Sequence, residues 1–394
     1  MLTLDCGLEF DPVRDEEFFA ALPPDSAVCL IESKESSGQP LFIRTQDLRR
    51  RLQRLLGPPD PASKRLNLRD FAKGVRYRLT PSPFEQTFAY YQNSKELFPA
   101  RYRDMLRMRP PAVLKVNLRN AYPRCYTTRK ISIDSHGDPC GGVYFGPFLS
   151  RKAADAFAER VLDLFKVRRC QIKIRRDPEF PGCIYSEMKM CLAPCFAGCS
   201  KEEYDVEVQR LLAFLETGGG SLRDSLEHER NRASEELDFE KASQLHKKLD
   251  KLDDALRGQP ELPRRLQDLD AVILQRGLGE QSLAVYQVRA GRIADPFEIS
   301  FGAQTGELRS AEQLLRERIE NASPPEAADL SEHLWLLARW FYSNPRQGEI
   351  FFRENTWPYR RMMRACARLL APPAPATENN GSADPSSGES EKTS

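Results

Sequence analysis

The sequence RRCQIKIRRDPEFPGCIYSEMKMCLAPC, residues 168–195, places four cysteines in one short basic segment. Twelve, seven and three residues separate Cys170, Cys183, Cys191 and Cys195. Thiolates are soft ligands, and four of them form a closed site for an iron–sulfur cluster or for zinc. Because these cysteines lie among Pro, Gly and Arg rather than in an apolar run, we predict that they hold a metal.

The spacing separates the two metals only weakly. Structural zinc sites usually pair cysteines at two to four residues in both halves of the site. Here only Cys191 and Cys195 are so close, which favours an iron–sulfur cluster and leaves zinc as the alternative. Cys199, four residues further on, is expected to be a free thiol.

Length and composition limit the class of protein. A chain of 394 residues is long enough for two to four domains, and 40% hydrophobic residues allow real cores. No apolar run approaches the roughly 20 residues of a membrane span, and the acidic N-terminus lacks the basic region of a signal peptide. We therefore expect a cytoplasmic protein with no membrane partner, in which ten cysteines indicate metal or free thiols rather than disulfides.

The net charge of +2 conceals a strong asymmetry. Residues 41–180 hold 30 Lys and Arg against 13 Asp and Glu, and the rest of the chain has an excess of acidic residues. A block this basic favours a DNA-binding face, because neutralising phosphates releases counterions. The alternative is a surface matched to the acidic part of the same chain. The candidate DNA-binding residues are Arg49, Arg50, Arg51, Arg101, Arg103, Arg129, Lys130, Arg168 and Arg169.

The patterning predicts a multidomain α/β protein. In the first unit, two short strands (DSAVCLIES and QPLFIRT) precede the amphipathic helix TQDLRRRLQRLL, and a further helix is expected over 83–97. In the second unit, Ser150 is a plausible N-cap, and Ser200 opens a helix with a capping box. The expected units are 1–122, a cysteine-rich unit 123–220, a helical hairpin 221–257, a small α/β unit 266–370 and a disordered tail 371–394.

The hairpin 221–257 has an apolar stripe at helical spacing, with a bend at Leu237-Asp238. Two helices of this length cannot bury both faces alone, so the stripe needs either a partner helix pair or the rest of the chain. The pattern does not choose between these. The candidate partner-binding residues are Phe239, Ala242, Leu245 and Leu249.

Taken together, these segments resemble the bacterial excinuclease subunit UvrC family. The stretches that carry the resemblance are PRCYTTRK (123–130), VYFGPFLS (143–150), the Cys-x7-Cys-LAP-Cys pattern and NRASEELDFEKASQLHKKLDKL (231–252), which is similar to the UVR motif. The resemblance implies nucleotide-excision repair, a four-iron cluster on the four cysteines and docking of UvrB through the hairpin. It also implies a GIY-YIG nuclease fold for the first unit.

The first unit departs from that nuclease motif. The family uses tyrosines, a helical arginine and a glutamate that holds magnesium. Here Cys29 and Phe42 stand where the motif has tyrosines, Arg44 stands at the glycine position, and the glutamate register falls at or near Tyr91. Only Arg51 matches.

We therefore expect a degenerate GIY-YIG-like domain with no catalytic residues. Two alternatives are a working endonuclease with an altered site, and an interaction protein that competes for UvrB without binding DNA. The family's RNase H-like nuclease and helix-hairpin-helix region lie further along than this sequence reaches.

Overall fold

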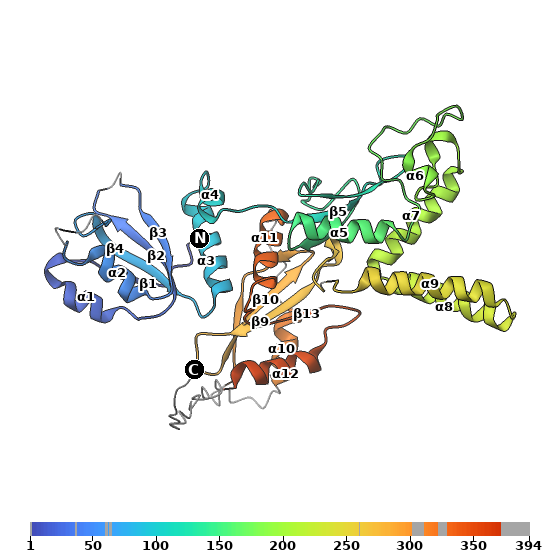
Figure 1. Cartoon of the computed structure of the whole chain (residues 1–394). Coiled ribbons are helices and arrows are strands. Elements are labelled where there is room, and N and C mark those ends of the chain that lie inside the picture. Colours follow the sequence, from blue (N-terminus) through green and yellow to red (C-terminus); the bar gives the residue numbers. More distant parts are fainter. Residues whose placement is uncertain are drawn as a thin grey trace, which may run out of the picture.

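The computed structural model describes residues 2–371, except 36–37, 60–61, 63–64, 260, 302–310 and 322–328. Three β-sheets, helices packed on them and one projecting helical hairpin make up this part of the chain (Figure 1). The expectation of a mixed α/β protein is therefore confirmed. No described helix is long and apolar enough to span a membrane. We expected a disordered tail over residues 371–394; residues 372–394 of it lie outside the described residues.

The first sheet is antiparallel, with the order β1-β4-β2-β3. Its strands are β1 (Cys6–Glu9), β2 (Ala27–Ser33), β3 (Leu41–Thr45) and β4 (Ala72–Leu79). One face packs on α1 (Asp15–Ala21), which follows a short 3-10 turn (Pro12–Arg14), and on α2 (Leu48–Leu56). The other face packs on α3 (Pro83–Leu97). Successive side chains of a strand point to opposite faces, so β2 supplies Cys29 to one core and Leu30 to the other.

The two helices expected in this unit form as their sequences indicate. In α2, Leu48, Leu52, Leu55 and Leu56 are buried, and the Asp47 side chain caps the helix by accepting from the Arg50 backbone N–H. In α3, the Ser82 hydroxyl oxygen accepts from the Glu85 N–H. The short helix α4 (Tyr102–Leu106) follows α3.

The second sheet has the order β6-β5-β7-β8. Its strands are β5 (Ala112–Val116), β6 (Cys125–Thr128), β7 (Val143–Phe148) and β8 (Arg264–Arg265). Every residue of β5 is buried: the strand pairs on both sides, and its two faces pack in different cores, Val113 in one and Leu114 in the other. This sheet therefore extends across the boundary that the sequence suggested at residue 122.

Two capped helices pack in the core of this second sheet. The helix α5 (Arg151–Leu162) begins after the N-cap Ser150, and α7 (Lys201–Glu216) begins with the expected capping box of Ser200 and Glu203. Between them lie the cysteine segment, the short helix α6 (Ile184–Glu187) and a 3-10 turn (Pro194–Phe196).

The helical hairpin consists of α8 (Gly220–Glu235) and α9 (Phe239–Leu256) and projects from the body of the molecule (Figure 1). Leu237 adopts a positive φ of 59° at the bend, and the Asp238 side chain caps α9 by accepting from the Lys241 N–H. The apolar stripe of both helices joins the core of the second sheet.

The third sheet has the order β11-β10-β9-β13, with β12 also paired to β10. Its strands are β9 (Ala271–Arg276), β10 (Ser282–Arg289), β11 (Arg292–Ile293), β12 (Phe297–Ser300) and β13 (Glu349–Phe352). It follows a 3-10 turn (Leu266–Asp268). The helices α10 (Ala311–Glu320) and α12 (Tyr359–Leu370) pack on one face, and α11 (Leu330–Phe341) packs on the other.

The first and third sheets share one hydrophobic core. The Phe84 ring of α3 lies 4.8 Å, between ring centroids, from Tyr286 of β10 and 5.4 Å from Trp340 of α11. Figure 1 shows α3 and α11 lying between the first sheet and the third. The beginning and the end of the described chain are therefore joined by packing, not by a linker alone.

Candidate nucleic-acid interface and cysteine segment

The two residues at the tyrosine positions of the nuclease motif lie on opposite faces of the first sheet. Cys29 is fully buried beneath α1 and α2, and burial raises the pKa of its thiol to about 12. Phe42 faces α3 and stacks on Tyr90, with ring centroids 4.9 Å apart and planes 4° apart. Neither side chain supplies a hydroxyl, and a thiol with so high a pKa is not a nucleophile at neutral pH.

Tyr91 lies at the expected register of the metal-binding glutamate, and it is 3% exposed. Its hydroxyl donates to Glu332 Oε2 of α11 at 2.7 Å. Lys95 Nζ donates to the same oxygen at 3.3 Å, while the Tyr102 hydroxyl (2.5 Å) and Arg103 Nε (2.7 Å) donate to Oε1. An ionised carboxylate has about four lone-pair sites, so these four donors occupy the acceptor capacity of Glu332.

Electrostatics keep Glu332 ionised in this setting. Burial raises its pKa, but hydrogen bonds from Tyr102, Tyr91 and Arg103 and the charge of Lys95 lower the pKa overall. The carboxylate is therefore a structural acceptor between α11 and the α3–α4 segment.

Glu85, one of two acidic residues of α3 near this register together with Glu96, is also used internally. It is buried, and its oxygens accept from the Tyr286 hydroxyl at 2.9 Å and from Arg78 Nη2 at 3.1 Å. Burial raises its pKa, with the bonds to Tyr286 and Arg78 acting in the opposite direction. Arg51, the matching helical arginine, has a buried Nε without a hydrogen-bond partner in the described part of the chain.

Four of the candidate DNA-binding arginines make internal contacts: Arg49, Arg103 and Arg169, and also the more deeply buried Arg168. Arg49 Nε donates to the Leu22 carbonyl at 2.6 Å, and Arg103 pairs with Glu332 and Asp329. Arg169 pairs with Asp163 at 2.6 Å.

Arg168 is 5% exposed and donates to the carbonyls of Tyr122 (2.8 Å) and Ile172 (2.9 Å). The expectation that it faces DNA phosphates is therefore corrected: a buried guanidinium must satisfy its donors locally, and this one fixes the backbone that enters the cysteine segment.

The remaining candidates Arg50, Arg101, Arg129 and Lys130 are exposed. Lys173, Arg175 and Arg176 of the cysteine segment are exposed as well. In the sequence these three cations form the basic run Lys-Ile-Arg-Arg just before Asp177, which could have identified them as DNA-binding candidates. Exposure decides which cations of the basic block can meet phosphates.

The cysteine segment brings its four cysteines into electrostatic range of one another. Cys195 is buried, and Cys170, Cys183 and Cys191 are half-buried; all four are free thiols. Burial is the largest cause that raises the pKa of Cys191 to about 11; a hydrogen bond from the Ala193 N–H opposes it, and the charges of Cys170, Cys195 and Cys183 add to it.

Four thiols are the donor type that a soft metal takes, and the Arg168 guanidinium donates to Cys170 Sγ at 3.9 Å. Within the described ranges, no group of three or more His, Cys, Asp or Glu side chains forms a ready-made metal site. Cys199 is buried in the core beside α7.

The hairpin divides the candidate partner-binding residues into two groups. Leu245 and Leu249 are buried in the core that the hairpin shares with the second sheet, and Ala242 is half-buried. These three do not form the surface that a partner would meet. Phe239 is 68% exposed, and Leu237 beside it is 70% exposed. Periodicity groups Phe239 with the stripe, but the left-handed bend at Leu237 turns both side chains outward at the tip.

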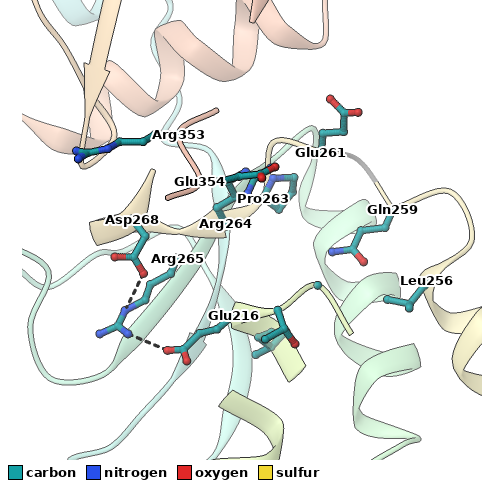
Figure 2. Close-up of a pocket in the computed structure, with 13 residues that line it drawn as sticks. Glu216, Leu256, Gln259, Glu261, Pro263, Arg264, Arg265, Asp268, Arg353 and Glu354 are labelled. Carbon is teal, nitrogen blue, oxygen red and sulfur yellow. Dashed lines mark hydrogen bonds and ion pairs between the residues drawn. The ribbon is translucent and has the colours of Figure 1, made fainter. Parts of the chain in front are cut away.

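A cavity of about 570 Å³ lies where the ends of α7 and α9 meet β8 and the segment that follows β13 (Figure 2). Its charged lining residues are Glu216, Glu261, Arg264, Arg265, Asp268, Arg353 and Glu354. Arg265 pairs with Glu216 at 2.7 Å and with Asp268 at 3.7 Å. Four carboxylates and three arginines are mixed in this lining, so neither sign of charge dominates the cavity.

Comparison with known proteins supports the family resemblance. Residues 112–214 match the family model described as the UvrC/Cho excinuclease middle domain. The UvrABC system protein C of Ruminiclostridium cellulolyticum is 30% identical over 195 residues, which are 49% of this chain and 31% of that protein. The proteins of the same name from Chlamydia abortus and Carboxydothermus hydrogenoformans are each 26% identical over 296 residues, or 74% of this chain.

The matched part of this chain spans less than half the length of these relatives, 48% of the Chlamydia abortus protein and 46% of the Carboxydothermus hydrogenoformans protein. No solved structure matches the chain at a significant level. The middle-domain match covers β5, β6 and β7 of the second sheet, the helices α5 and α6, most of α7 and the four cysteines, but not β8. The chain is therefore similar to UvrABC system protein C over up to 74% of its length.

Proposed function

We propose that this protein acts in nucleotide-excision repair by binding DNA and docking UvrB, without cutting DNA itself. Its similarity to UvrABC system protein C supports the repair role. The basic first half and the projecting hairpin supply separate surfaces for the two partners.

The observation that carries the non-cutting part is the position of Glu332. Cleavage in the GIY-YIG manner needs a carboxylate that binds magnesium against the scissile phosphate. The carboxylate that contacts Tyr91 accepts from four donors of its own chain, and Glu85 accepts from Tyr286 and Arg78. Magnesium prefers oxygen ligands with free lone pairs, which Glu332 does not offer. Glu85 is buried, and its two oxygens are held by Tyr286 and Arg78.

DNA binding in this proposal uses the exposed cations and not the buried ones. Arg50, Arg101, Arg129 and Lys130 are exposed, so they can reach phosphates without breaking an internal contact. Each phosphate that such a residue neutralises adds to the salt dependence of binding.

UvrB docking in this proposal uses the hairpin tip. Leu237 and Phe239 expose two large apolar side chains at the end of a projecting element (Figure 1). An exposed apolar anchor of this kind is typical of an interface hot spot. Leu245 and Leu249 stabilise the hairpin from inside.

The cofactor in this proposal is a four-iron cluster held by Cys170, Cys183, Cys191 and Cys195, with zinc as the alternative. Bound there, the metal would staple a segment that has little apolar core of its own and would orient Lys173, Arg175 and Arg176. Its role is structural, because the chain needs no redox step to bind DNA or a partner.

Separate binding and cleavage measurements test the proposal against its two alternatives. The purified chain should bind duplex DNA with an affinity that falls steeply with salt, and it should bind UvrB independently. Metal-dependent nicking would favour an active nuclease with an altered site. UvrB binding without DNA binding would favour a competitor for UvrB.

A further inference from the structure

A second cavity, of about 460 Å³, lies at the junction between the first sheet and α11. Three elements form its walls: the end of β3 with the turn into α2, the N-terminus of α3, and α11. Its lining residues are Arg44, Thr45, Gln46, Pro83, Phe84, Gln86, Thr87, Leu336, Arg339, Trp340 and Ser343.

The charge of this cavity is one-sided. Arg44 and Arg339 line it, and none of its lining residues is acidic. In the part of the chain that the structure describes, neither guanidinium has a salt bridge or a hydrogen bond. Two cations that approach without an anion repel each other, and burial together with the charge of Arg44 lowers the pKa of Arg339. By contrast, the cavity in Figure 2 mixes arginines with carboxylates.

Aromatic rings hold both guanidiniums in place. Arg44 Cζ lies 5.5 Å from the centroid of the Tyr90 ring, and Arg339 Cζ lies 5.5 Å from that of Trp335. A guanidinium placed over a ring is oriented through its face, so its N–H edges stay available for other acceptors.

Most other polar groups of the cavity are already used. Gln86 Nε2 donates to the Thr45 carbonyl at 2.7 Å, the Thr87 hydroxyl donates to the Pro83 carbonyl, and the Ser343 hydroxyl donates to the Trp340 carbonyl. Arg44, Arg339 and the exposed Gln46 remain as donors. The N-terminus of α3 adds a partial positive charge through Pro83 and Phe84.

We propose that this cavity binds the phosphate of a nucleotide between Arg44 and Arg339. Paired arginines match the geometry of phosphate oxygens, and the adjoining Phe84 and Trp340 offer an apolar wall for a sugar or base. The inference does not depend on the proposed DNA-binding function. A free nucleotide presents the same phosphate as a nucleotide within a strand, so the cavity could take either. It also gives a role to Arg44, at the glycine position of the nuclease motif.

The test measures binding of thymidine monophosphate, thymidine and a ten-residue oligothymidylate to the full chain by calorimetry. Wild type should bind a phosphorylated probe at least about tenfold more tightly than thymidine. The variants Arg44→Gln and Arg339→Gln should each weaken that binding by about tenfold or more, the range of one charge-assisted hydrogen bond. The exposed Arg364 of α12, which is outside the cavity, supplies the matched control Arg364→Gln.

The two sources of phosphate separate in the same experiment. Binding of the monophosphate assigns the site to free nucleotides, and binding of the oligonucleotide alone assigns it to a strand, provided that both arginines are needed. Arg44→Lys should retain more affinity than Arg44→Gln, which guards against a folding effect. The proposal is overturned if neither phosphorylated probe binds, or if both cavity variants bind as tightly as Arg364→Gln.

Discussion

At Cys29, Tyr91 and His333, burial changes what a reactive side chain can do. Burial raises the pKa of the Cys29 thiol to about 12. Burial and the Glu332 carboxylate also raise the pKa of the Tyr91 hydroxyl, which donates a hydrogen bond to that carboxylate. Residue identity already argued against catalysis at Cys29 and Tyr91, which stand where the nuclease motif has a tyrosine and a glutamate. Their surroundings make them parts of the core.

His333 of α11 should make stability depend on pH. It is buried, its Nδ1 accepts from the Ile293 N–H at 2.9 Å, and burial together with the charge of Lys95 lowers its pKa to about 4. The unfolded chain protonates near pH 6.5, so the unfolded state binds more protons than the folded state between about pH 6.5 and 4. The free energy of unfolding should therefore fall as the pH falls through that window.

Between pH 7 and 5 this histidine should account for a loss of about 2 kcal/mol in the free energy of unfolding. Urea melts of wild type and His333→Gln across that range measure it. The variant, whose amide oxygen can still accept from Ile293, should show a flatter pH dependence. Identical slopes in the two proteins would rule out this histidine as the source.

The cysteines give a second prediction at the residue scale. Anaerobically purified protein should be brown, with the broad visible absorption of an iron–sulfur cluster. Cys191→Ser should remove the colour and increase protease sensitivity within residues 165–200, whereas Cys199→Ser should leave the colour intact because Cys199 lies in the core. If the protein is colourless and contains stoichiometric zinc, the four cysteines bind zinc and not an iron–sulfur cluster.

At the scale of elements, local patterns predicted helices better than they predicted partners. The leucine spacing of α2, the capping box of α7 and the bend at Leu237-Asp238 all appear where the sequence indicated. Periodicity defines an apolar face but does not name what covers it. For that reason the sequence left open whether the hairpin stripe packs internally, and the structure places Leu245 and Leu249 in the core shared with the second sheet.

Long-range pairing was beyond the sequence. The strand β5 lies within residues 1–122, which the sequence grouped as the first unit, yet it pairs with β6 and β7 of the second sheet. A short apolar strand fits any sheet with an open edge, so its partners cannot be read from its own residues. The saturation of Glu332 could not be predicted either, since its donors lie more than 200 residues away along the chain.

The hairpin predicts opposite outcomes for two substitutions. Phe239→Ala should leave thermal stability nearly unchanged and weaken UvrB binding by at least about tenfold, since truncating an interface anchor costs about 2 kcal/mol or more. Leu245→Ala should lower the free energy of unfolding by about 2–4 kcal/mol through a core cavity. Denaturation curves and titration with UvrB distinguish the two. Loss of stability in Phe239→Ala with unchanged UvrB binding would contradict the proposed docking tip.

At the scale of the whole molecule, the first and last parts of the described chain behave as one packed body. Their shared core includes Phe84, Tyr286 and Trp340, and Glu332 ties α11 to α3 and α4 through hydrogen bonds. This packing fills the side of the first sheet that carries Phe42.

Glu332→Ala should therefore weaken the junction between the two parts. Removing one partner of a buried ionic network leaves the others without an acceptor and typically costs about 3 kcal/mol or more. Scanning calorimetry should show a lower melting temperature, and proteolysis should increase near residues 98–111. The exposed Glu354, changed to Ala, is the control and should have little effect. Equal melting temperatures would show that the network does not hold the junction.

The central claim is that this UvrC-like protein binds DNA but does not cut it. Incision of a damaged duplex by the full chain, with UvrA, UvrB and either magnesium or manganese, tests it most directly. Binding should persist and fall steeply with salt, while nicking should be absent, and Tyr91→Glu alone should not restore it. Nicking by the wild-type protein that Arg51→Ala abolishes, and that Arg54→Ala leaves intact, would contradict the account.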